Sequence, residues 1–187
     1  MTVRRLGLFG GTFDPPHLGH VAALRAAAGS GRFNRLEVTV AGDPYRKSDE
    51  VRPSAQRLAM AHAAFDDLPL VTVSDREIVR AGPSYTVDTV RELLADAREI
   101  DLVVGADLAG ELDSWHEAPA LRDLVSVGIV PRPGTVTVAP EGWTCYVVSM
   151  EPVDLSSSFI RAMGSGAANL GNFLPAAVIP IFEAYGG

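Results

Sequence analysis

Short apolar runs alternate with amphipathic stretches along the whole chain. The apolar runs are rich in β-branched residues, which is typical of buried strands. They cover residues 3–9, 36–41, 70–73, 100–107, 124–134 and 144–150. The stretches with helical spacing cover residues 16–28, 54–65, 83–97, 108–115, 156–163 and 175–185. Pro16 suits the first position of the first helix, because the N–H that proline lacks would be unpaired there anyway.

Strands separated by helices predict crossover connections, and these require a parallel sheet. Because the strands are almost continuously apolar, we expect both faces of the sheet to be covered. The chain contains no low-complexity segment, no Ser/Gly-rich linker and no internal repeat. The pattern therefore predicts an α/β fold: a Rossmann-like, doubly wound parallel sheet with helices on both faces, in a single domain over residues 1–187.

Composition narrows the possible partners. The 187 residues carry a formal net charge of −7, and nucleic acids and anionic membranes both favour basic surfaces, so we expect neither as a partner. Cys145 is the single cysteine, which excludes an internal disulfide and a cysteine-rich zinc site. No apolar run approaches the length of a membrane span. A reduced, cytoplasmic setting fits these features.

A glycine turn and two histidines follow the first predicted strand, in the segment GGTFDPPHLGH. His17 and His20 have the spacing that places two side chains on one face of a helix. Three interpretations are open: a metal site completed by Asp14, structural histidines, or donors to a phosphate. The third is favoured, because glycines let a backbone approach a ligand and a helix N-terminus attracts anions.

Other nucleotide and hydrolase motifs are absent. The chain has neither the glycine-lysine pattern of a P-loop nor the G-x-G-x-x-G of dinucleotide-binding enzymes. It also lacks the G-x-S-x-G of serine hydrolases.

Two distant motifs together resemble the signatures of the HxGH nucleotidyltransferase superfamily. The first is HLGH, residues 17–20, and the second is LSSSFIR, residues 155–161. Within that superfamily the chain most resembles bacterial nicotinate-nucleotide adenylyltransferases, on four further segments. These are PYRK (44–47), SYTVDTVREL (84–93), GADLAGELDSW (105–115) and PRPG (131–134). Ser158 stands where that family usually has threonine, and the triple serine also resembles phosphopantetheine adenylyltransferase.

The resemblance implies transfer of the adenylyl group of ATP to nicotinate mononucleotide, which gives deamido-NAD and pyrophosphate. It implies small-molecule substrates and Mg²⁺ that arrives with ATP rather than at a protein metal site. The residues implied as catalytic are His17, His20 and Arg161. Those implied to bind ATP are Gly10, Gly11, Thr12, Gly105, Asp107, Ser157, Ser158 and Arg161. Those implied to bind the acceptor are Lys47, Tyr85, Thr86, Trp115 and Arg132.

Three alternatives stay open at this stage. The first is an adenylyltransferase for another phosphate monoester, such as phosphopantetheine. The second is a nucleotide-binding protein without turnover, and the third is a metal-dependent hydrolase that uses Asp14 and the two histidines. The sequence indicates no oligomeric state.

Overall fold

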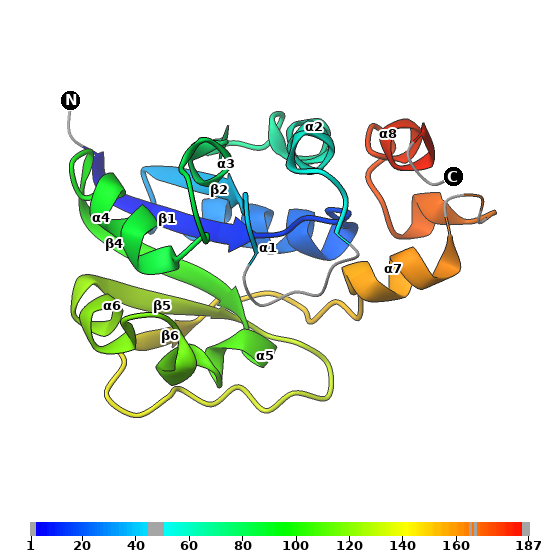
Figure 1. Ribbon diagram of the computed structural model, residues 1–187. Coiled ribbons are helices and arrows are strands. Elements are labelled where there is room, and N and C mark those ends of the chain that lie inside the picture. The colour runs from blue at the N-terminus through cyan, green and yellow to red at the C-terminus, as the bar shows by residue number, and fades with distance from the viewer. Residues whose placement is uncertain (1–2, 45–50, 165, 167, 185–187) are drawn as a thin grey trace.

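The computed structural model describes residues 3–44, 51–164, 166 and 168–184, and in them six strands form one sheet (Figure 1). The strands are β1 (Val3–Gly11), β2 (Arg35–Val40), β3 (Val71–Ser74), β4 (Ala97–Gly105), β5 (Val125–Val130) and β6 (Cys145–Val147). Their order in the sheet is β3-β2-β1-β4-β5-β6, and every neighbouring pair is parallel. The predicted doubly wound parallel sheet is confirmed.

Helices cover both faces of this sheet. The α-helices are α1 (Leu18–Gly29), α2 (Ser54–Phe65), α3 (Arg76–Val79), α4 (Thr86–Leu93), α5 (Ala106–Ala109), α6 (Ala118–Leu124), α7 (Ser157–Met163) and α8 (Ile179–Ala184). Two short 3₁₀ helices are η1 (Leu112–Ser114) and η2 (Leu170–Asn172). Among the described residues, every helix falls short of the length and apolarity that a bilayer crossing requires.

Alternating side chains of the central strands build two separate cores. Leu102 and Val104 of β4 face a cluster formed with α4, α5 and α6, whereas Val103 between them faces a cluster formed with α1 and α2. This alternation is the ordinary period of a strand, in which successive side chains point to opposite faces. Burial on both faces explains the unbroken apolar runs within β1 and β4, whereas β2 alternates polar and apolar residues.

A third apolar cluster attaches the C-terminal segment to α2. Met60 of α2 packs with Ile160 of α7 and Phe182 of α8, and all three side chains are buried. Figure 1 shows α7 and α8 beyond the arrowhead end of β1, far from the helices at the opposite end of that strand. The cluster therefore places the second sequence motif at the carboxyl ends of the strands.

Several element boundaries differ from the predictions. α1 begins at Leu18 with His17 as its N-cap, so Pro16 precedes the helix and is not its first residue. The helix predicted over residues 83–97 is only Thr86–Leu93, because β4 already begins at Ala97. The short helices α3 and α6 were not predicted, since one or two turns give too few residues to show a helical period.

Candidate active site

A cleft of about 530 Å³ lies at the carboxyl ends of β1 and β4. The strand order reverses between these two strands, which is where open α/β sheets bind their ligands. Most residues implied by the family resemblance line this cleft. They are Gly10, Gly11, Thr12, His17, His20, Thr86, Gly105, Asp107, Trp115, Arg132, Ser157 and Ser158.

The two glycines at the end of β1 serve different purposes. A Cβ atom on Gly10 would meet no atom within 4 Å, so this backbone leaves open space for a ligand. A Cβ atom on Gly11 would instead lie 2.8 Å from the ring of Phe13. Gly10 therefore leaves room for a ligand in the cleft, whereas Gly11 leaves room for the ring of Phe13.

The two histidine rings stack on each other at the start of α1. Their centroids are 3.7 Å apart, and His20 Nδ1 accepts a hydrogen bond of 3.1 Å from the backbone N–H of His17. Gly19 makes this stack possible, because a Cβ atom there would lie 3.0 Å from His17 Nδ1. The ring of Phe13 meets His20 edge-on, with centroids 5.3 Å apart. The glycine of the HxGH motif is therefore a packing requirement of its first histidine.

His17 is buried, and burial is the main reason that its pKa falls to about 4. The positive charge of Arg132 lowers the pKa further. The imidazole of His17 is consequently neutral at pH 7 in the absence of ligands. Its Nδ1 atom is buried without a hydrogen-bond partner among the described residues.

This lowered pKa predicts a pH dependence of stability. In the unfolded chain the pKa of His17 is near the ordinary value of 6.5, so between about pH 6.5 and pH 4 the unfolded state binds the extra proton. The free energy of unfolding should therefore fall as the pH drops through this range, by about 3 kcal/mol from His17. Urea denaturation of the wild type and His17→Asn at several pH values measures this contribution as their difference. Parallel curves for the two proteins would contradict it.

The second motif reaches the first through side chains of α7. Ser157 Oγ donates a hydrogen bond of 2.9 Å to the backbone oxygen of Pro15, and Arg161 Nη1 donates one of 2.7 Å to that of Asp14. Arg161 Nη2 also donates to Ser158 Oγ. The two helix starts therefore lie side by side at one end of the cleft.

Within this motif the serines divide their tasks. Ser156 is the N-cap of α7, and its Oγ accepts a hydrogen bond of 3.1 Å from the backbone N–H of Phe159. Ser157 holds the Pro15 carbonyl, and Ser158 receives the guanidinium of Arg161. Arg161 does not line the cleft in this arrangement. Its contact with the turn before α1 and with Ser158 places it at the cleft margin.

The carboxylate of Asp14 forms an ion pair with Arg52. It accepts hydrogen bonds from Arg52 Nη1 (2.9 Å) and from the Arg52 backbone N–H (3.1 Å), and the side chain is buried. The described residues contain no group of three or more histidine, cysteine, aspartate or glutamate side chains that could hold a metal. The metal-site interpretation of Asp14, His17 and His20 thus finds no support in this part of the chain.

Arg57, which no sequence motif marked as part of the site, is 1% exposed behind the cleft. Its guanidinium donates to the backbone oxygens of Arg52 (2.8 Å), Thr12 (2.9 Å) and Gly42 (3.3 Å). Thr12 follows β1, Gly42 follows β2 and Arg52 precedes α2, so one guanidinium connects three segments. An arginine on the inward face of a predicted amphipathic helix was the available signal, because arginine is rarely buried unless paired.

The side of the cleft implied for the acceptor is only partly assembled from the implied residues. Thr86 and Trp115 line it, and Trp115 Nε1 is buried without a partner among the described residues. Tyr85 does not line it, since its ring stacks on His116 with centroids 3.9 Å apart. Lys47 lies outside the described residues.

Arg132 lies among the residues implied for ATP. Its Nε is 3.3 Å from Asp107 Oδ1, and its Nη1 donates to the backbone oxygen of Leu155. A Cβ atom on Gly105 would lie 2.3 Å from that same Asp107 oxygen. Arg132 also contributes to the low pKa of His17. Its implied role at the acceptor phosphate stays a prediction.

Ser84 and Glu77 also line the cleft, and sequence reasoning gave neither a place in the site. Ser84 does not cap the following helix, since the N-cap of α4 is Tyr85. Ser84 Oγ instead accepts hydrogen bonds from the backbone N–H groups of Gly42 (2.9 Å) and Asp43 (3.2 Å). No sequence pattern marks Glu77, because its burial becomes visible only in the folded structure.

Comparison with known proteins supports the assignment suggested by the motifs. The cytidylyltransferase-like family profile matches residues 8–163. A nicotinate-nucleotide adenylyltransferase of Bordetella petrii is 32% identical over 98% of this chain and 98% of its own length. The chain belongs to the nicotinate-nucleotide adenylyltransferase family. A relative of the same name from Albidiferax ferrireducens is 42% identical over 70% of this chain and 67% of its own.

A solved structure has the same fold as this chain. It is nicotinic acid mononucleotide adenylyltransferase of Plasmodium falciparum complexed with NaAD, with a TM-score of 0.80 and 18% identity. The similarity covers 97% of this chain and 96% of that one.

Proposed function

We propose that the protein transfers the adenylyl group of ATP to nicotinate mononucleotide and forms deamido-NAD and pyrophosphate. The observation that carries this proposal is the convergence of the two helix starts on one cleft, through the contact of Ser157 with Pro15 and of Arg161 with Asp14. Two helix N-termini side by side offer N–H groups and positive dipole ends to one polyphosphate. Membership of the adenylyltransferase family supports the choice of substrates.

The reaction needs no general base and no covalent intermediate. A phosphate monoester loses its second proton with a pKa of about 6, so the acceptor is already an anion at neutral pH. Its oxygen attacks the α-phosphorus of ATP, a P–O bond forms, and the bond to the bridging oxygen breaks as pyrophosphate leaves with the electron pair. Catalysis then consists of alignment of the two anions and stabilisation of the charge that develops between them.

The residues at the two helix starts fit these tasks. Thr12, His17 and His20 would hold the α- and β-phosphates, while Ser157, Ser158 and Arg161 would hold the β- and γ-phosphates. The imidazole of His17, which burial keeps neutral, would donate a hydrogen bond without repelling a bound magnesium ion. Arg132 lies beside Asp107 and close enough to His17 to affect its charge, so it would neutralise phosphate oxygens near the reacting centre.

Magnesium is proposed to enter as part of the substrate MgATP. Bound in this way, it neutralises charge on the phosphate oxygens and retains much of its own water, so it needs few protein carboxylates. The described residues fit this role, because they form no carboxylate cluster in the cleft and the Asp14 carboxylate is held by Arg52. The acidic chain and its single thiol support the proposal of a cytoplasmic enzyme that acts on small molecules.

Product formation tests this function directly. Purified protein with ATP and nicotinate mononucleotide should release pyrophosphate and form deamido-NAD in equal amounts. CTP in place of ATP, and phosphopantetheine or nicotinamide mononucleotide in place of the acceptor, serve as comparisons. A higher kcat/KM with phosphopantetheine would favour the alternative suggested by the triple serine. A lack of pyrophosphate release with every pair would indicate a binding protein without turnover.

Trp115→Ala should raise the KM for nicotinate mononucleotide by about tenfold, because the variant loses the stacking of the pyridine ring on the indole. Stacking of one base on an aromatic side chain contributes about 1–3 kcal/mol. The KM for ATP should change much less. Steady-state kinetics with each substrate varied in turn measures both values. Equal increases would show that Trp115 only supports the cleft wall.

A further inference from the structure

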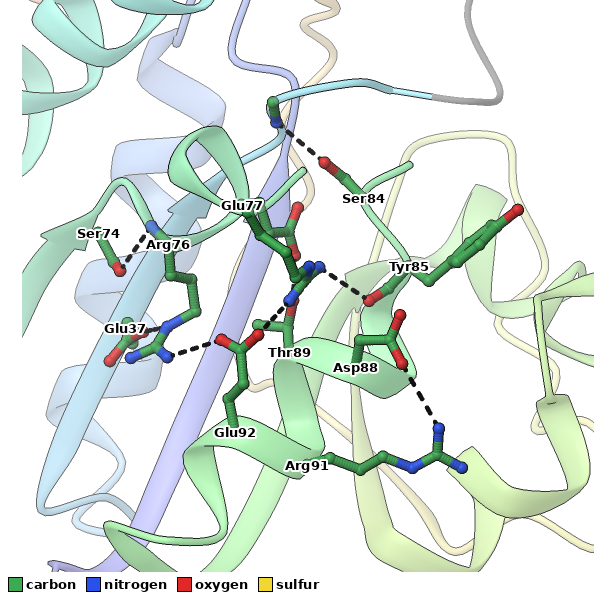
Figure 2. A network of polar contacts seen from close by, with 12 residues as sticks. Glu37, Ser74, Arg76, Glu77, Ser84, Tyr85, Asp88, Thr89, Arg91 and Glu92 are labelled. Atoms are coloured by element: carbon green, nitrogen blue, oxygen red, sulfur yellow. Dashed lines mark hydrogen bonds and ion pairs between the residues drawn. The ribbon is translucent and has the colours of Figure 1, made fainter. Parts of the chain in front are cut away.

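Glu77 is a buried carboxylate to which the reaction described above assigns no role. It lies on α3 at the wall of the cleft and is 7% exposed. The pKa of Glu77 is raised overall, mainly because the side chain is buried. Hydrogen bonds from Thr89 and Ser84 and the charge of Arg80 oppose this shift. Figure 2 shows Glu77 between Ser84 and Thr89, at the centre of a network that extends to Glu92 and Arg76.

The hydrogen bonds around Glu77 have a fixed direction. A hydroxyl group has one donor and two acceptor sites. Ser84 Oγ already accepts from the N–H groups of Gly42 and Asp43, so its hydrogen is left to donate to Glu77. Thr89 Oγ1 accepts from Arg80 Nη2 at 3.1 Å and donates to Glu77 Oε1 at 2.6 Å. Only a group that accepts from both hydroxyls satisfies this arrangement.

These contacts join two segments that border the acceptor side of the cleft. One is Gly42–Pro44 after β2, in which Pro44 lines the cleft. The other is the start of α4, in which Thr86 lines it. The backbone N–H of Ser84, just before α4, donates to the Asp43 carbonyl oxygen at 3.0 Å. The backbone of Glu77 is in close contact with the first segment as well, because a Cβ atom on Gly42 would lie only 2.1 Å from the Glu77 carbonyl oxygen. Loss of the carboxylate would therefore leave the hydroxyls of Ser84 and Thr89 without their acceptor, next to the place where the two segments meet.

We propose that Glu77 is a positioning residue for the acceptor, which fixes the segment after β2 and the start of α4 relative to each other. This inference rests on the proposed function, since it concerns the acceptor half of the same cleft. The ATP half is built on β1, α1 and α7, and Glu77 contacts none of these phosphate-binding side chains. The expected consequence is an effect on one substrate and not on the other.

Glu77→Gln tests the inference with almost no change in volume. Its amide NH₂ would face either Ser84 Oγ, which has no lone pair left, or Thr89 Oγ1, whose hydrogen would then lose its acceptor. Either orientation leaves a buried polar group unpaired, at a cost that corresponds to about tenfold or more in affinity. The KM for nicotinate mononucleotide should rise by about tenfold, and the KM for ATP should stay within about twofold. Ser84→Ala should show the same split, and the double variant should be no worse than the poorer single variant.

Glu37→Gln is the matched control. Glu37 is a buried carboxylate on β2 that is 4% exposed, and it pairs with Arg35 and Arg76 at the far end of the same network, away from the cleft. It should lower the thermal unfolding midpoint as Glu77→Gln does and leave both KM values unchanged. The inference is overturned if Glu77→Gln raises both KM values equally, or if Glu37→Gln reproduces the acceptor effect. Should Glu77→Gln not fold, Ser84→Ala decides by the same criterion.

The wild-type reaction separates this inference from the proposed function. If the wild type makes no deamido-NAD, the proposed function fails and the inference fails with it. If the wild type makes deamido-NAD while Ser84→Ala and Glu77→Gln show no preference for the acceptor, only the inference fails.

Discussion

His20→Ala should lower kcat at least about 100-fold, the scale of losing one donor to the charge that develops in a transition state. His20 Nδ1 accepts from the backbone N–H of His17, so Nε2 is the ring nitrogen that can donate. We expect this Nε2–H to donate to the α-phosphate. The binding of MgATP should weaken much less than kcat falls, because several other groups hold the triphosphate. Steady-state kinetics and calorimetry with MgATP measure the two quantities.

His62→Ala is the matched control for this variant. His62 lies on the exposed side of α2 and pairs with Asp66 one turn later. Its loss should leave kcat unchanged. A kcat for His20→Ala within about twofold of the wild type would remove the imidazole from the mechanism and leave His20 as a packing partner of Phe13 and His17.

Arg57→Met should lower the free energy of unfolding by about 3 kcal/mol and weaken the use of both substrates. Methionine matches much of the side-chain volume, but it leaves the carbonyls of Thr12, Gly42 and Arg52 without their donor. A buried carbonyl that loses its partner costs about 1–3 kcal/mol, and removal of the buried charge offsets part of that total. Urea denaturation measures the change in stability.

Arg91→Met provides the comparison for Arg57. Arg91 is exposed on α4 and pairs with Glu117 and Asp88, so its loss should leave the urea midpoint almost unchanged. If both variants unfolded at the wild-type midpoint, Arg57 would contribute nothing measurable to the join between the three segments. The kinetic pattern is also distinctive, since Arg57→Met should affect both substrates and Glu77→Gln only the acceptor.

Local patterns predicted those features that depend on neighbours in sequence. The helix over residues 54–65 was predicted with its observed bounds, and the strands at 3–9 and 36–41 were placed within two residues of their ends. Runs of this length show their period clearly, whereas α3 and α6 are too short to do so. The motifs around His17 and Ser157 were identified because they are contiguous in sequence.

Contacts between distant segments were not predictable in the same way. The sequence pattern places Arg57 within a helix and Ser84 within a family-like segment, and it gives neither these two residues nor Glu77 a structural role. Each gains its role from a partner in another segment: Ser84 from Gly42, Glu77 from Thr89, and Arg57 from Thr12. The different contacts of Ser156, Ser157 and Ser158 also became visible only in the folded structure.

The sequence by itself determined the alternation of strands and helices, the resemblance to an adenylyltransferase family, and the two motifs that carry it. Hydrophobic period and short motifs are local properties, so they can be read from the order of residues. Only the tertiary structure decided that the start of α7 meets the turn before α1. It also decided that His17 is neutral through burial, and that Arg57 and Glu77 hold the cleft walls. These properties depend on which atoms exclude water and accept hydrogen bonds once segments far apart in the chain have packed together.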